Sequence, residues 1–136
     1  MKKPATNWPK PENFKPIDAY KAVLLEVDGE KYLRFSRESL TTSYERHGEI
    51  LKRFLVEMRI PRDDTIESGS DLFPSPKGDR YNVIAMGKVG MDFTDKEACF
   101  KGDSFDYSIP GFKEEHLPVI KELITDVAPD WKIKTK

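Results

Sequence analysis

The residue with the clearest chemical potential is His47, an imidazole in a segment that is typical of the start of a helix. Thr42 and Glu45 form a capping box, in which each side chain accepts a hydrogen bond from the backbone N–H of the other residue. A helix over about 42–58 places His47 near the positive helix end, which favours its neutral, base-competent form. A histidine on an apolar face is also a common structural residue, so both interpretations stay open here.

Cations and glycines elsewhere in the chain supply the groups that a phosphate site needs. We expect Lys21, with Arg34 or Arg37, to contact phosphate oxygens. Backbone N–H groups of a glycine-flanked turn at 87–91 would also donate to the phosphate oxygens, and together with the cations they would form an anion cradle. His47 would act as a general base toward water. The alternative interpretation is that the cations face solvent and that Gly87 and Gly90 only mark a bulge.

Other common site motifs are missing from the sequence. It contains no Walker loop, no zinc-ligand spacing, no Gly-x-Ser-x-Gly elbow and no dinucleotide fingerprint. Its two histidines, His47 and His116, lack a metal-ligand partner at helical spacing. We therefore expect neither a metal nor a cofactor.

Composition limits the classes of partner. The chain has 136 residues, with 23 Lys and Arg against 24 Asp and Glu. A net charge this close to zero does not indicate binding to nucleic acid, so we expect no nucleic-acid partner. No apolar run approaches the roughly 18 residues that span a bilayer, so we expect no membrane partner. A single cysteine, Cys99, and the lack of a signal-peptide pattern predict a cytoplasmic location.

The elements that must position these residues follow from the hydrophobic pattern. Proline density predicts an extended N-terminal arm over 1–16, followed by one domain over 17–136. The pattern predicts strands over 20–27, 31–36, 80–89 and 131–134, and an interrupted strand over 65–73. It predicts helices over 42–58 and 119–127, and an aromatic-rich loop over 92–115. The Asp28-Gly29 pair predicts a tight turn between the first two strands. This order predicts a single α+β domain, in which two main helices pack on a mixed β-sheet of about five to six strands.

Short motifs occur in a recognisable order along residues 20–133. They are Tyr20-Lys-Ala-Val-Leu-Leu-Glu-Val27, Leu33-Arg34, His47-Gly-Glu-Ile-Leu-Lys-Arg-Phe54, Ser68-Gly-Ser70, Asn82-Val-Ile-Ala-Met-Gly-Lys-Val-Gly-Met91 and Pro129-Asp-Trp-Lys-Ile133. The first resembles an aromatic-Lys-x-Val-Leu-Ile strand, the third a His-x-Asp-Ile-Tyr helix and the last a closing Pro-Asp-Tyr-x-Val segment. In these motifs and their order, the chain resembles the janus/ocnus family of small protein histidine phosphatases.

The resemblance implies a metal-independent hydrolysis of a phosphoramidate in a phosphorylated protein or a small molecule. It implies His47 as the general base and Lys21 and Arg34 as contacts near the phosphate. It also implies Val89 and Met91 as donors of backbone N–H groups to phosphate oxygens. The chain departs from the family where a triple glycine is reduced to Gly69 and where Val89 replaces a phosphate-contacting serine.

Two other functions stay open from the sequence. One is a non-enzymatic interaction module on the same scaffold. It would bind a partner protein through the anion cradle, or through the aromatic loop over 100–112, which is part of the segment 98–113. A nucleic-acid or nucleotide binder would stack bases on Tyr32 and Phe35, although the near-neutral charge disfavours it.

Overall fold

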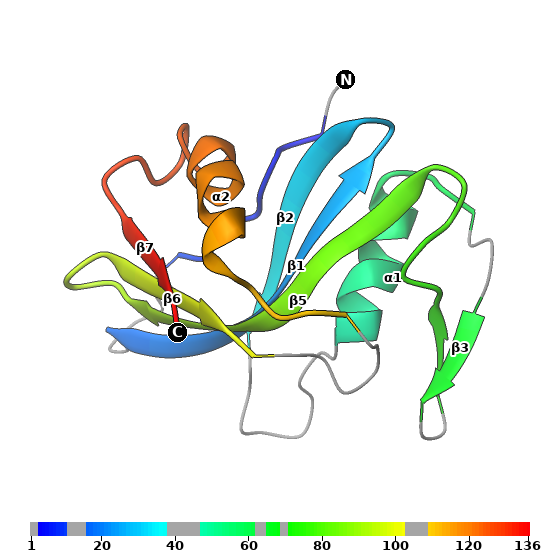
Figure 1. Cartoon of the computed structure of the whole chain (residues 1–136), viewed down its shortest axis with the longest axis horizontal. Helices are drawn as coiled ribbons and strands as arrows, with labels where there is room; N and C mark the ends of the chain where they lie inside the picture. The colour runs from blue at the N-terminus through cyan, green and yellow to red at the C-terminus, as the bar shows by residue number, and fades with distance from the viewer. Residues whose placement is uncertain (1–2, 11–15, 38–46, 62–64, 69–70, 103–108) are drawn as a thin grey trace.

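The computed structural model describes residues 3–10, 16–37, 47–61, 65–68, 71–102 and 109–136 (Figure 1). Its elements are β1 (Ile17–Val27), β2 (Glu30–Arg37), α1 (His47–Glu57), β3 (Thr65–Ser68), β4 (Asp71–Pro74), β5 (Tyr81–Asp92), β6 (Glu97–Lys101), the short 3-10 helix η1 (Glu114–His116), α2 (Leu117–Leu123) and β7 (Lys132–Thr135). Five strands form one sheet in the order β2-β1-β5-β6-β7, and β3 and β4 form a separate hairpin. Only the β6–β7 pair in this sheet is parallel. The predicted α+β fold, with two helices on a mixed sheet, is confirmed.

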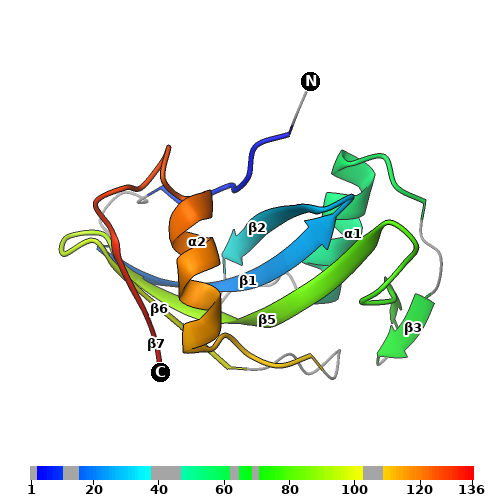
Figure 2. The same ribbon diagram turned by 45° about the horizontal axis from the view of Figure 1, so that its top comes forward.

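The two helices cover opposite faces of the sheet (Figures 1 and 2). Successive residues of a strand point to opposite faces, so β1 contributes to both cores. Val23 and Leu25 pack in the core under α1, whereas Ala22 and Leu24 pack in the core that includes Ile120 of α2. The central strand β1 is therefore buried on both faces of the sheet.

The turn between β1 and β2 has the predicted Asp-Gly form. Asp28 and Gly29 have φ angles of 50° and 87°, the left-handed conformation that a two-residue type I′ hairpin turn needs at both central positions. The Asp28 N–H donates to the Arg80 carbonyl at 3.0 Å, and Arg80 Nη2 donates to the Asp28 carboxylate at 2.7 Å. These bonds connect the turn to the residue just before β5.

Two sequence interpretations are wrong. Residues 87–91 lie inside β5 and form no turn. The predicted loop over 92–115 contains β6 and η1, and its Phe100 and Phe112 are buried in the core under α2. Glu97–Lys101 is too short to stand out by its own pattern, and it becomes a strand because β5 and β7 both pair with it.

The described part of α1 lies within the predicted helix over 42–58. The bounds predicted for the second helix, 119–127, are wrong: α2 begins at Leu117 and ends at Leu123, and residues 124–127 form turns in which Val127 is exposed. The predicted apolar stripe of α1 is confirmed, since His47, Leu51, Phe54 and Leu55 are all buried. Thr42, Tyr44 and Glu45, like Gly69, lie outside the described residues. Pro118 lies in the first turn of α2, where its missing N–H costs no helical hydrogen bond. No helix in the described part of the chain is long and apolar enough to cross a membrane.

The N-terminal arm is attached to the outer edge of β2. The Leu33 N–H donates to the Ala5 carbonyl at 2.9 Å, and the Asn7 side chain exchanges two hydrogen bonds with the backbone of Phe35. The Trp8 ring packs edge-on against Phe35 and Trp131, at centroid distances of 5.3 and 5.2 Å. The arm residues 3–10 are therefore part of the folded body.

Candidate functional site

His47 lies at the start of α1 with only 4% of its surface exposed. Its Nε2 atom is 2.9 Å from the carbonyl oxygen of Gly87 in β5. A carbonyl oxygen can only accept a hydrogen bond, so Nε2 carries the proton of the neutral ring and Nδ1 carries the lone pair. Such a bond to a backbone carbonyl fixes both the tautomer and the orientation of an imidazole base.

Glycine is required on both sides of this contact. A Cβ at Gly48, the next residue of α1, would lie 2.3 Å from Cγ of the buried Phe73 in β4. A Cβ at Gly87 would lie 2.2 Å from the Lys101 carbonyl oxygen. Both distances are far below van der Waals contact, so Gly48 allows α1 to pack closely on Phe73 and Gly87 allows the Lys101 backbone to pack closely on β5. At Gly90, by contrast, a Cβ would meet nothing within 4 Å.

A row of lysines crosses the sheet beside this contact. Lys21 of β1 lies opposite Ser36 of β2 and Lys88 of β5, and Lys88 lies opposite Lys101 of β6. Directly opposite residues share a face of the sheet, and Lys21 shares its face with Val23, which packs under α1. We call Lys21, Lys88 and Lys101 the lysine row.

The lysine row lies next to the carbonyl that holds His47. Lys88 directly follows Gly87 in β5, and Lys21 directly precedes Ala22, which lies opposite Gly87. Lys21 is half-buried, and Lys88 is exposed. The structure thus places Lys21 next to the residue opposite Gly87, and it adds Lys88 and Lys101 to the same row. Sequence reasoning missed these two because the strand register, which aligns them with Lys21, has no local signal.

Arg34 lies away from this group. It is 5% exposed, and its guanidinium donates to both carboxylate oxygens of Glu57 at 3.2 Å. Glu57 is the last residue of α1, ten residues after His47 and hence about 15 Å further along the helix axis. The structure therefore does not bring Arg34 and His47 together. Arg37 ends β2 opposite Tyr20, and its side chain lies outside what the structure describes.

Val89 and Met91 are fully buried in the core under α2. Their backbone lies in the middle of the sheet, between β1 on one side and β6 on the other. The N–H groups of this segment therefore face neighbouring strands, and we leave both residues out of the candidate site.

The aromatic side chains that the two alternative functions would use are not exposed where the structure describes them. Phe100 and Phe112 are buried, while Phe105 and Tyr107 lie outside the described residues. Tyr32 and Phe35 are 4% and 3% exposed and belong to different cores, so they do not form a platform for base stacking.

The chain matches no family model, and a search of the curated proteins finds no match. Among the described residues, no group of three His, Cys, Asp or Glu side chains is placed to hold a metal ion. His116, the other histidine, accepts a hydrogen bond at Nδ1 from the Lys113 backbone N–H at 2.9 Å and lies at the start of α2. The candidate site thus consists of His47, Gly87 and the lysine row.

Proposed function

We propose that this protein is a metal-independent phosphohydrolase that removes phosphate from phosphohistidine or phospholysine. The observation that carries the proposal is the hydrogen bond from His47 Nε2 to the Gly87 carbonyl, beside the lysine row. This hydrogen bond supports a tautomer of His47 in which Nδ1 carries the lone pair. The lysine row beside it supplies positive charges that can attract phosphate oxygens. The nitrogen-linked phosphate follows from the resemblance to protein histidine phosphatases.

In the proposed reaction, His47 Nδ1 takes a proton from a water molecule as the water oxygen attacks phosphorus. A new P–O bond forms and the P–N bond breaks, with its electron pair staying on the substrate nitrogen, which then takes up a proton. Phosphoryl transfer depends mainly on positioning and on stabilising the charge of the phosphoryl oxygens. Lysine ammonium groups near these oxygens would supply that stabilisation.

The lysine row suits this role because of its register. Both Lys21–Lys88 and Lys88–Lys101 are directly opposite pairs, so the three side chains lie on one face of the sheet. A phosphate bound over this face would be within reach of more than one lysine. We expect Lys21, the half-buried member, to contribute most to phosphate binding because its charge is screened least by solvent.

The test is the release of phosphate from a phosphohistidine peptide by the purified protein, with EDTA present. His47→Gln keeps a side-chain N–H donor but lacks the imidazole, and we expect its rate to fall about 100-fold or more. His116→Ala, the matched control, should keep the wild-type rate. Equal rates for the wild type and His47→Gln, with both folded by circular dichroism, would remove His47 from the mechanism.

One observation favours a second candidate, a non-enzymatic module that binds a phosphorylated partner. His47 is 4% exposed as a residue, which restricts the space for an attacking water in this conformation. Saturable binding of the phosphohistidine peptide without phosphate release by the wild type would support this module and contradict the hydrolase. Loss of that binding in Lys21→Gln would assign it to the lysine row.

A further inference from the structure

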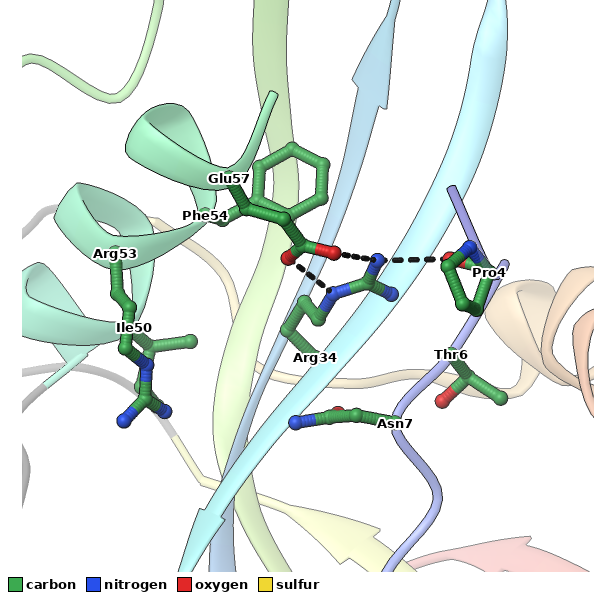
Figure 3. Close-up of a pocket in the computed structure, with 8 residues that line it drawn as sticks. All are labelled: Pro4, Thr6, Asn7, Arg34, Ile50, Arg53, Phe54 and Glu57. Carbon is green, nitrogen blue, oxygen red and sulfur yellow. Dashed lines mark hydrogen bonds and ion pairs between the residues drawn. The ribbon is translucent and has the colours of Figure 1, made fainter. Parts of the chain in front are cut away.

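The outer edge of β2 carries the N-terminal arm, residues 3–10, as an additional extended segment (Figures 1 and 3). β2 is the first strand in the sheet order, and on its outer edge Thr6 and Leu33 form a parallel bridge. The Leu33 N–H donates to the Ala5 carbonyl there at 2.9 Å. The edge of a sheet offers backbone groups to any further extended chain, and the arm pairs with them as a peptide does in strand addition.

Hydrogen-bond donors line this edge at regular positions. The N–H groups of Leu33 and Phe35 both point outward, because alternate residues of a strand direct their N–H groups to the same side. Between them, Arg34 Nη2 donates to the Pro4 carbonyl at 2.7 Å, as Figure 3 shows. The Arg34 guanidinium also donates to Glu57, so it is oriented before any peptide arrives. An extended chain with carbonyl oxygens toward this edge therefore meets preformed donors.

The edge leads to an aromatic slot, which Phe35 and Trp131 form. The Trp8 ring packs edge-on against both, at centroid distances of 5.3 and 5.2 Å. Large aromatic side chains in such slots supply much of the binding energy at interfaces. In peptide recognition by strand addition, main-chain hydrogen bonds give affinity and a side-chain pocket gives specificity, and this edge has both features.

The arm leaves two of its own polar atoms unsatisfied. Thr6 is 7% exposed, and its hydroxyl oxygen and the Trp8 Nε1 atom are buried without a hydrogen-bond partner among the described residues. A buried polar atom without a partner weakens an interaction that an apolar group of the same shape would keep. Asn7, by contrast, suits the edge, because its side chain exchanges hydrogen bonds of 2.8 and 3.1 Å with the Phe35 backbone. A segment with an apolar residue in place of Thr6 should therefore bind this edge more tightly than the arm does.

We propose that the outer edge of β2 is a binding site for an extended segment of a partner protein, and that the arm occupies it as an intramolecular competitor. The partner segment has a β-branched apolar residue at the Thr6 position, followed by an asparagine and an aromatic anchor. A tethered competitor acts at a high effective concentration, so only a segment that binds more tightly displaces it. The edge shares no residue with the candidate site, so this binding would be independent of the proposed phosphohydrolase.

Two fluorescent peptides test the proposal, one with the sequence of residues 3–10 and one with Thr6→Val in that sequence. The full-length chain with Asn7→Ala is the receptor, because this change removes two hydrogen bonds of the arm at an exposed position and so frees the edge more often. Fluorescence anisotropy should show the Thr6→Val peptide binding about tenfold more tightly than the other peptide. It should also bind the Asn7→Ala chain about tenfold more tightly than the wild-type chain.

Lys10→Ala in the full-length chain is the matched control, since it changes an exposed position of the same arm and should bind the peptides like the wild type. A peptide with Trp8→Ala should lose binding. The proposal is overturned if the Asn7→Ala chain binds neither peptide, if the two peptides bind equally, or if the Trp8→Ala peptide binds as well as the others. Asn7 is exposed, so we expect its variant to fold, and an excess of each peptide over the wild-type chain gives the same comparison.

Discussion

The orientation of His47 depends on one backbone carbonyl in a strand on the other side of the core under α1. The Gly87 carbonyl oxygen accepts the hydrogen bond of His47 Nε2 at an N···O distance of 2.9 Å, and Gly87, having no side chain, leaves room for the Lys101 backbone. The same imidazole therefore has a structural role as well as the chemical role that we propose. Substitutions that keep or remove a donor to the Gly87 carbonyl should therefore differ in their effect on the free energy of unfolding.

His47→Ala should lower the free energy of unfolding by about 2 kcal/mol, because it leaves a cavity and an unpaired Gly87 carbonyl. His47→Gln should cost less, since its amide can still donate to that carbonyl. Urea denaturation measures both. His116→Ala, at the short η1–α2 junction, serves as the control and should cost well under 1 kcal/mol. Equal stabilities for the two His47 variants would contradict the role given to the Gly87 contact.

Tyr32 gives a pH-dependent prediction. Burial raises the pKa of the Tyr32 phenol, and its hydrogen bond to Glu30 raises it further. The folded protein thus keeps this proton to higher pH than the unfolded chain, so stability is lost as the pH rises above the ordinary value of about 10. Phenylalanine cannot ionise, so Tyr32→Phe should show a smaller decrease in the free energy of unfolding between pH 8 and pH 11 than the wild type. The same alkaline slope in both proteins would contradict the assignment.

Gly48 and Gly90 differ in the space around them: a side chain at Gly48 would meet Phe73, whereas a side chain at Gly90 would meet open space. Gly48→Ala should destabilise the protein by about 1–2 kcal/mol, because the clash with Phe73 outweighs the higher helix propensity of alanine. Gly90→Ala should be neutral or slightly stabilising, since its Cβ meets no atom within 4 Å. Thermal unfolding of the two variants checks this directly. A Gly48→Ala protein as stable as Gly90→Ala would show that α1 is not held against Phe73.

The elements differ in how far the sequence alone could predict them. The β1–β2 hairpin and both helices have local signals, namely the Asp28-Gly29 turn, the apolar stripe of α1 and Pro118. β6 has none of comparable strength, since five residues become a strand only through β5 and β7. In the candidate site, residue type and spacing point to His47, Lys21 and Gly87, whereas Lys88 and Lys101 join them only through the strand register. The Arg34–Glu57 pair, which lies outside the site, depends on a contact between residues 23 apart and has no local signal either.

The molecule as a whole includes its N-terminal arm as a structural part. Trp8 contacts Phe35 of β2 and Trp131 just before β7, and so joins the two ends of the sheet over the face that α2 covers. Trp8→Ala should therefore lower the free energy of unfolding by about 2 kcal/mol. It should also make residues 3–10 easier to cleave in limited proteolysis. Lys10→Ala, an exposed position in the same arm, should change neither measurement, and an unaltered Trp8→Ala protein would show that the arm contributes little.

The proposed function depends above all on the His47 imidazole lying next to a row of lysines that binds phosphate. Long-range ¹H–¹⁵N NMR of the imidazoles, recorded while inorganic phosphate is added, observes both features in one titration. We predict an Nε2–H tautomer for His47, a saturable shift of its ring nitrogens, no such shift for His116, and weaker binding in Lys21→Gln. An Nδ1–H tautomer, or His47 signals that do not respond to phosphate, would contradict the proposed site.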